Sequence, residues 1–266
     1  MSLQVPLAPD PHAALGRRNP VAKLTACMVI LVGLVVTSDP LTPGLLLGLE
    51  LVAVPFTGVR LVTLLRRSWL LLLSVGGVAL TNLIVVNGGR QLVDLGLLDI
   101  TTGGVDSAVT VTLRLLAITL PGIVVLAATE PMDLADALVQ RWHVPARFAY
   151  GALAALRLLP LLSADWQMIA RARRARGLDP GRSPVGRLRM FASQTFAVLV
   201  AAIRRGVRLA TAMEARGFDA RGQRSVARPQ PMRPGDWALI AGTGAVVLLA
   251  TGISVAVGTW SPAFGG

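Results

Sequence analysis

The sequence is poor in charge for a chain of its length. Charged residues make up only 15% of its 266 residues, whereas 53% are hydrophobic and the mean hydropathy is +0.64. In soluble domains, charged residues usually make up about a quarter of the sequence. This apolar composition excludes an ordinary soluble domain and favours a protein that crosses a membrane several times.

Lysine is nearly absent. Lys23 is the only lysine among the 26 basic residues, and it follows Ala22. The Walker A loop that cradles nucleotide phosphates needs Gly-Lys before Ser or Thr, so this chain lacks that ATP-binding motif. We therefore do not expect this chain itself to be an ATPase of that class.

Cysteine and histidine are also scarce. The single cysteine, Cys27, excludes an internal disulfide and lies in an apolar run, where a buried thiol is expected. His12 and His143 are far apart in the sequence, unlike the closely spaced ligand pairs of most metal sites. Paired carboxylates and the common nucleophile and zinc motifs are missing too. We therefore expect no catalytic residue, no metal site and no bound cofactor.

Long apolar runs are abundant. A spanning helix needs about 20 mostly apolar residues. Five runs are predicted to be spans: 21–36, 41–59, 69–86, 107–128 and 237–257. Two shorter runs, 148–162 and 191–203, are predicted to belong to long helices lying obliquely at the cytoplasmic surface, although two further short spans are the alternative.

Positive charge is concentrated in one segment. Residues 129–235 hold 18 of the 26 basic residues and 7 of the 14 acidic ones, a net charge of +11. Because basic loops tend to stay in the cytoplasm, this segment and the N-terminus are predicted inside and the loop 87–106 outside. The result is an all-α, multi-pass protein of the cell membrane. Its predicted parts are 1–128 with about four spans, the cytoplasmic helices of 129–235, and a last span in 236–266.

Two stretches of the basic segment nearly repeat each other. Residues 175–182 read ARGLDPGR and residues 215–222 read ARGFDARG, after predicted helices over 147–176 and 185–216. Gly177 and Gly217 are expected just past each helix, in the left-handed conformation that glycine adopts cheaply. Arg176 and Arg216 would then be the last helical residues, where the helix dipole favours a cation.

Each motif by itself predicts no more than a well-capped helix end. As a pair, the motifs would hold two planar guanidinium groups at rigid helix tips, which suits bidentate binding of carboxylates. Two such tips match two equivalent acidic grooves, as two copies of one partner domain would offer.

These motifs resemble the T component of energy-coupling factor (ECF) transporters, the EcfT/CbiQ-like family. The resemblance is carried by GRRNPVAKL, ATEPMDLADAL, LRLLPLLSADWQMIARARRARG and ATAMEARGF, at residues 16–24, 128–138, 156–177 and 210–218. It implies two crossed coupling helices whose tips dock into two cytoplasmic ABC-type ATPase subunits. The tip residues, carried over by position, are Ala175, Arg176, Gly177, Ala215, Arg216 and Gly217. It also implies a separate substrate-binding membrane subunit (S component), uptake of a vitamin or a transition-metal ion, and no enzymatic activity on this chain.

Two charged residues lie inside predicted spans. Glu50 and Arg114 are at similar depths from the outer ends of the second and fourth spans. Charges within a membrane are commonly paired, so we expect these two to form a structural ion pair, with a functional role as the alternative.

Three alternatives to a coupling subunit follow from the sequence. An ordinary ABC permease would bind its substrate itself. A membrane-bound enzyme using paired metals would need clustered aspartates, whereas Asp94, Asp99 and Asp106 are scattered along one loop. Binding of nucleic acid by the arginine-rich segment is disfavoured because no aromatic residues are interleaved, and anionic membrane lipid explains the charge more simply.

Overall fold

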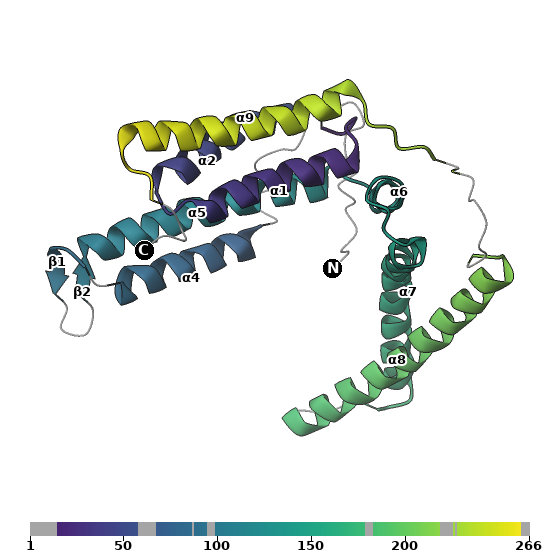
Figure 1. The fold of residues 1–266 in the computed structure, drawn as a ribbon. Helices are drawn as coiled ribbons and strands as arrows, with labels where there is room; N and C mark the ends of the chain where they lie inside the picture. The colour runs from purple at the N-terminus through teal and green to yellow at the C-terminus, as the bar shows by residue number, and fades with distance from the viewer. Residues whose placement is uncertain are drawn as a thin grey trace. The chain divides into compact units, whose positions relative to one another are not determined.

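The computed structural model describes residues 15–57, 68–86, 88–94, 99–178, 183–218, 226 and 228–261. These residues are mainly helical, as the sequence predicts (Figure 1). The chain divides into two compact units. Residues 1–137 with 230–266 form what we call the membrane unit, and residues 138–229 form the two-helix unit.

All five predicted spans are helical in the membrane unit. The helices are α1 (Pro20–Val36), α2 (Leu41–Ala53), α4 (Trp69–Val85), α5 (Thr102–Ala127) and α9 (Pro234–Val257). In the second span, predicted over 41–59, the α-helix α2 ends at Ala53 and continues as the 3₁₀ turn η1 (Val54–Thr57); residues 58 and 59 lie outside the described residues. The fourth begins five residues earlier than predicted, where the Thr101 hydroxyl caps α5 by accepting a hydrogen bond from Gly104.

A short hairpin that the sequence analysis did not foresee lies between α4 and α5. Strands β1 (Gln91–Asp94) and β2 (Asp99–Thr101) pair antiparallel. It belongs to the loop that the charge pattern places outside the membrane.

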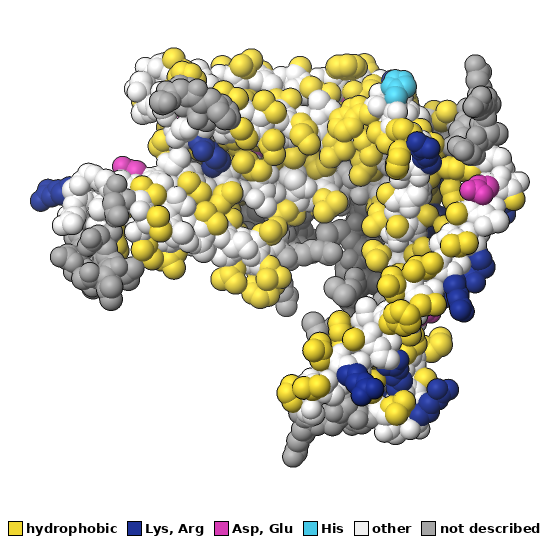
Figure 2. All heavy atoms as spheres, turned by 60° about the horizontal axis from the view of Figure 1, so that its bottom comes forward, with side chains coloured by type: hydrophobic (Ala, Val, Ile, Leu, Met, Phe, Trp, Pro, Cys, Tyr) yellow, Lys and Arg dark blue, Asp and Glu magenta, His cyan; other side chains and the backbone are white. Residues whose placement is uncertain are grey.

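The helices of the membrane unit pack side by side, with α1 next to α9 and α4 next to α5 (Figure 1). The interior contains Leu34, Leu46, Ala117, Val247 and Ala250. Small residues allow close approach: a Cβ on Gly33 would lie 2.3 Å from Cγ1 of Val247. Many large apolar side chains stay exposed on the outer surface, as in a protein that meets lipid (Figure 2).

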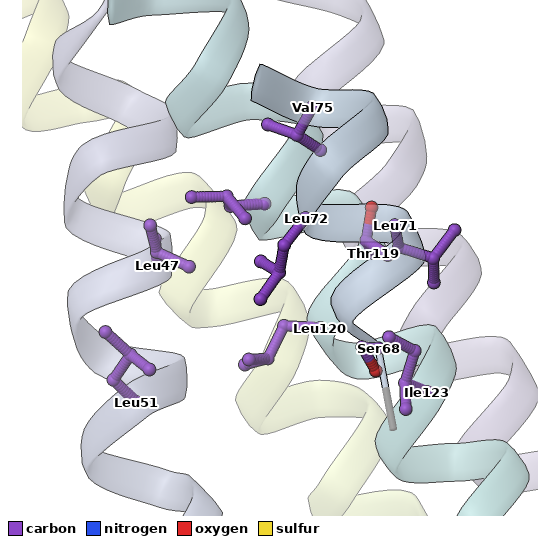
Figure 3. A pocket seen from close by; sticks show the side chains of 10 residues that line it. Leu47, Leu51, Ser68, Leu71, Leu72, Val75, Thr119, Leu120 and Ile123 are labelled. Atoms are coloured by element: carbon purple, nitrogen blue, oxygen red, sulfur yellow. The ribbon is translucent and has the colours of Figure 1, made fainter. Parts of the chain in front are cut away.

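An apolar cavity of about 160 Å³ opens between α2, α4 and α5 (Figure 3). The side chains of Leu47, Leu72 and Leu120, one from each helix, face one another across it (Figure 3). Among the described lining residues, only Ser68 and Thr119 carry polar side-chain atoms. The cavity therefore offers few groups that could orient a polar solute.

A buried carboxylate joins the end of α1, the start of α2 and the C-terminal part of α9. Asp39, in the turn between α1 and α2, is 1% exposed. Its Oδ2 accepts hydrogen bonds of 2.7 Å from the Thr42 amide, the Thr42 hydroxyl and the Ser254 hydroxyl of α9. Burial favours a raised pKa, but these hydrogen bonds outweigh it and hold the pKa of Asp39 below its ordinary value of 3.8.

Replacing this carboxylate should destabilise the membrane unit. In Asp39→Ala, three hydrogen bonds to a charged acceptor are lost, and we expect a loss of about 2–3 kcal/mol at neutral pH. Because the folded pKa is depressed, this stabilisation is complete above about pH 4 and disappears as the pH falls through the folded pKa. Thermal unfolding in detergent can be monitored by size-exclusion chromatography. The midpoints of the wild type and of Asp39→Ala should differ at pH 7 and converge in acid. An unchanged midpoint at pH 7 would show that the carboxylate does not stabilise the fold.

The basic segment forms three helices, and the ends of the two long ones agree with the predicted 147–176 and 185–216 to within one residue. The three helices are α6 (Pro131–Arg141), α7 (Ala146–Ala175) and α8 (Pro184–Ala215). Helix α7 is unbroken through Pro160, and Ser183 caps α8 by accepting a hydrogen bond from Gly186. Among the described helices, α5, α7 and α9 are long and apolar enough to span a membrane. Helices α1, α2 and α4 are apolar but shorter, and α8 is not one of the three.

Candidate functional site

The two Ala-Arg-Gly motifs form the same backbone structure. Gly177 and Gly217 have φ angles of 71° and 72°, the left-handed conformation expected for them. In each motif two amides donate back into the helix: Gly177 to Arg174 and Leu178 to Arg173 in the first, Gly217 to Glu214 and Phe218 to Met213 in the second. This pair of backbone hydrogen bonds defines the Schellman motif, which fixes the direction in which the chain leaves the helix.

The arginines lie one residue beyond their predicted positions. Helix α7 ends at Ala175 and α8 at Ala215, so Arg176 and Arg216 are the C-cap residues and not the last helical ones. Both side chains are exposed, and within the described part of the chain neither makes a hydrogen bond or ion pair. Two free guanidinium groups are thus held at two rigid helix ends.

Helices α7 and α8 cross, with their C-terminal ends at opposite ends of the pair (Figure 1). Arg173, near the end of α7, donates to the Met190 carbonyl and to the carbonyl and hydroxyl of Ser193, near the start of α8. At the other end, Phe218 packs edge-on against Tyr150, with ring centroids 6.0 Å apart. Each tip therefore lies beside the beginning of the other helix.

An ion pair holds the middle of the crossing. Nη1 of Arg205 lies 2.7 Å from Oδ2 of Asp165, and Nη2 donates to Oδ1 over 3.2 Å. Next to it, Gln194 donates to the Trp166 carbonyl at 2.8 Å. The sequence analysis missed this interaction. Its one signal was that Asp165 is the only acidic residue of α7.

The surroundings of the two tips differ. Beside the second tip is a cavity of about 300 Å³, lined by Arg147, Gly151, Ala210, Met213, Glu214 and Phe218. At the first tip, Leu178 occupies the position equivalent to Phe218 and is 54% exposed. Positive side chains gather along α7 and α8, whereas the visible face of the membrane unit is mainly apolar (Figure 2).

The predicted ion pair between Glu50 and Arg114 is wrong. The Arg114 guanidinium donates instead to the carbonyl of Thr37, just past the end of α1, where free carbonyls attract a cation. The two carboxylate oxygens of Glu50 are buried and have no hydrogen-bond partner among the described residues. Depth along two helices did not determine which way each side chain faces around its helix.

No cluster of three or more His, Cys, Asp or Glu side chains among the described residues could hold a metal ion. The features that stand out are the two arginine tips and the helix crossing between them.

Comparison with known proteins gives one family. The family described as CbiQ, cobalt transport protein, matches residues 13–226. A curated relative, the energy-coupling factor transporter transmembrane protein EcfT of Limosilactobacillus fermentum, is 30% identical over 215 residues, which cover 78% of this chain and 80% of the relative. The EcfT protein of Listeria innocua is 28% identical over 216 residues, covering 77% and 80%. The chain therefore belongs to the EcfT/CbiQ family, the T components of ECF transporters.

Proposed function

We propose that this chain is the coupling subunit of an ECF-type importer. It transmits the ATP-driven movement of two cytoplasmic ATPase subunits to a separate substrate-binding membrane subunit. The observation that carries the proposal is the pair of exposed C-cap arginines, Arg176 and Arg216, on identical Schellman endings. Vitamins or transition-metal ions are the proposed class of substrate, and no chemical step takes place on this chain.

Each tip would enter a groove of one ATPase and bind a carboxylate there. The guanidinium group suits this role because its planar fork can donate two parallel hydrogen bonds. The rigid ending matters as much as the charge, because a fixed helix end transmits displacement whereas a mobile loop absorbs it. The crossing through Asp165 and Arg205 would make α7 and α8 move as one lever.

A permease that binds its own substrate is the second candidate. The apolar cavity between α2, α4 and α5 is the observation that favours it. A site for a vitamin or metal ion would need several converging polar groups, and of the described lining residues only Ser68 and Thr119 carry polar side-chain atoms. The coupling role accounts for more of the structure.

The orientation in the membrane is part of the proposal. The N-terminus and the segment 129–235 should face the cytoplasm, and the hairpin region should face outward. Single cysteines replacing Arg90 and Arg189, in a Cys27→Ser background, can be treated with an impermeant thiol reagent on intact cells. Labelling is expected at position 90 and not at 189; the reverse pattern would overturn the topology.

The function itself is tested by purification of the tagged chain in mild detergent, followed by mass identification of its partners. A coupling subunit should bring two ABC-type ATPase chains and a small membrane protein. Recovery of the chain without ATPases, under conditions where its fold survives, would contradict the proposal.

A further inference from the structure

Two connections lead from the membrane unit into the two-helix unit. The first runs through α6, which crosses the boundary after Ala137, and the second returns at Gln230. The membrane unit binds the chain at Ala128, nine residues before the first boundary, and at Gln230, the second boundary, through side chains at the start of α1. These contacts all lie within the membrane unit.

The first connection is held by the only lysine of the chain. Lys23, in α1, is 2% exposed, and its Nζ donates to the carbonyl of Ala128 at 2.7 Å. Ala128 is the C-cap of α5, three residues before α6 begins. The negative charges of Asp133, in the first turn of α6, and of Asp236 attract the same ammonium group.

The second connection is held by Asn19, which is 5% exposed. Its Nδ2 donates to the Gln230 carbonyl at 3.1 Å and lies 3.5 Å from the Pro231 carbonyl. Its backbone amide donates to Oδ1 of Asp236 at 3.0 Å, while Oδ2 of Asp236 accepts from the Arg233 amide at 2.8 Å. The start of α9 and the returning chain are thus bound to the start of α1.

The two connections also contact each other. Nε2 of Gln230 lies 3.5 Å from Oδ1 of Asp133, which is in α6. Arg18 adds to the cluster, because a Cβ on Gly235 would lie 1.6 Å from its Nη1, so that the guanidinium covers the first turn of α9. One polar cluster at the start of α1 therefore contacts both segments of the membrane unit that lead to the two-helix unit.

The cost of this cluster suggests a role beyond packing. Burying an ammonium group in an apolar protein costs several kcal/mol unless it is well compensated, and an apolar side chain would fill the same space. A compact ammonium can approach one carbonyl where the wider fork of an arginine would not fit, in a chain whose other basic residues are all arginine.

We propose that Asn19, Lys23 and Asp236 form a clamp that holds both connections to the two-helix unit and passes its movement on to α1 and α9. The transmission part rests on the proposed coupling function. The clamp itself does not, because it can be detected in the chain without any partner. These residues act through the backbone segments that they hold, and are therefore positioning residues.

The clamp is tested first by hydrogen exchange on the purified chain. Lys23→Met removes the ammonium group, and Asn19→Ser keeps an acceptor for capping α1 while removing the amide donor. Arg17→Met, which removes an exposed charge two residues from Asn19, is the control. We expect exchange in 128–134 to rise about tenfold in the first variant and in 228–236 in the second, with the middle of α5 unchanged. Unchanged exchange in both segments would overturn the clamp. If Lys23→Met does not fold, exchange of 228–236 in Asn19→Ser decides the test, and an unchanged rate there would overturn the clamp.

Transmission is tested by repeating the measurement on the complex recovered with its ATPases, with and without ATP and vanadate. In the wild type, nucleotide should change exchange in α8 and at the starts of α1 and α9. In Lys23→Met the change should persist in α8 and disappear from α1 and α9, with Lys23→Arg intermediate. An undiminished change in α1 and α9 would contradict transmission through the clamp. Absence of any change in α8 of the wild type would instead contradict the proposed function.

Discussion

The double variant Arg176→Ala/Arg216→Ala should insert into the membrane normally and lose its ATPases. Both guanidinium groups are exposed and make no contact within the described chain that their removal would break. In a docked complex, truncating one partner of such a charged contact typically costs about 2–5 kcal/mol. Recovery of ATPase on affinity purification should therefore fall at least tenfold, while the membrane subunit that binds substrate is still recovered.

The matched control is Arg174→Ala/Arg208→Ala. It removes two exposed arginines from the same helices, two and eight residues before the C-caps, and changes the net charge equally. Its ATPase recovery should be close to that of the wild type. An equal loss of ATPase recovery in both double variants would show that the motif acts only through its general positive charge. Lysine at positions 176 and 216 should restore ATPase binding only in part, because an ammonium group lacks the planar fork of a guanidinium group.

Breaking the helix crossing should separate binding from transmission. Asp165→Ala leaves Arg205 without its carboxylate; the two side chains are 19% and 31% exposed. We expect a loss of about 1–2 kcal/mol and a broader distribution of distances between spin labels placed at Leu178 and Glu214, near the two tips. Individual ATPases should still bind, because each tip is intact, but ATP hydrolysis should be coupled poorly to movement of the membrane helices.

Arg204 provides the control for this experiment. It is adjacent to Arg205, is exposed and makes no hydrogen bond or ion pair with the described residues. Arg204→Ala should leave the label distances unchanged, and the charge-exchanged variant Asp165→Arg/Arg205→Asp should narrow them again. A narrow distribution in Asp165→Ala would show that apolar packing alone holds the crossing.

The ends of the basic helices could be predicted from the sequence because their determinants are local. A glycine that must adopt positive φ, preceded by a long helical run, defines an ending within a few residues, and Gly177 and Gly217 behaved accordingly. The apolar runs predicted the membrane helices for the same reason, since hydrophobicity is a property of a single stretch. Their exact ends were less certain, as at Ala53, where the helix gives way to a 3₁₀ turn.

The contacts between helices could not be predicted in the same way. Asp165 and Arg205 are 40 residues apart, and many arginines could have been chosen as the partner of the aspartate. Lys23 binds a backbone carbonyl, which has no signature in the sequence. The error at Glu50 and Arg114 has the same origin. The position of a residue along its apolar run gives its depth in the membrane but not the direction in which its side chain points around the helix.

The most direct test of the account is to detect the contact at the tips themselves. A photo-reactive amino acid is placed at position 176 or 216 in cells that contain the whole transporter, and Arg204, exposed on α8 twelve residues before Arg216, serves as the control position. Irradiation should join this chain to an ATPase subunit from each of the two tips and not from position 204. ATPases that purify with the chain but are cross-linked from neither tip would contradict the coupling role assigned to the repeated motif.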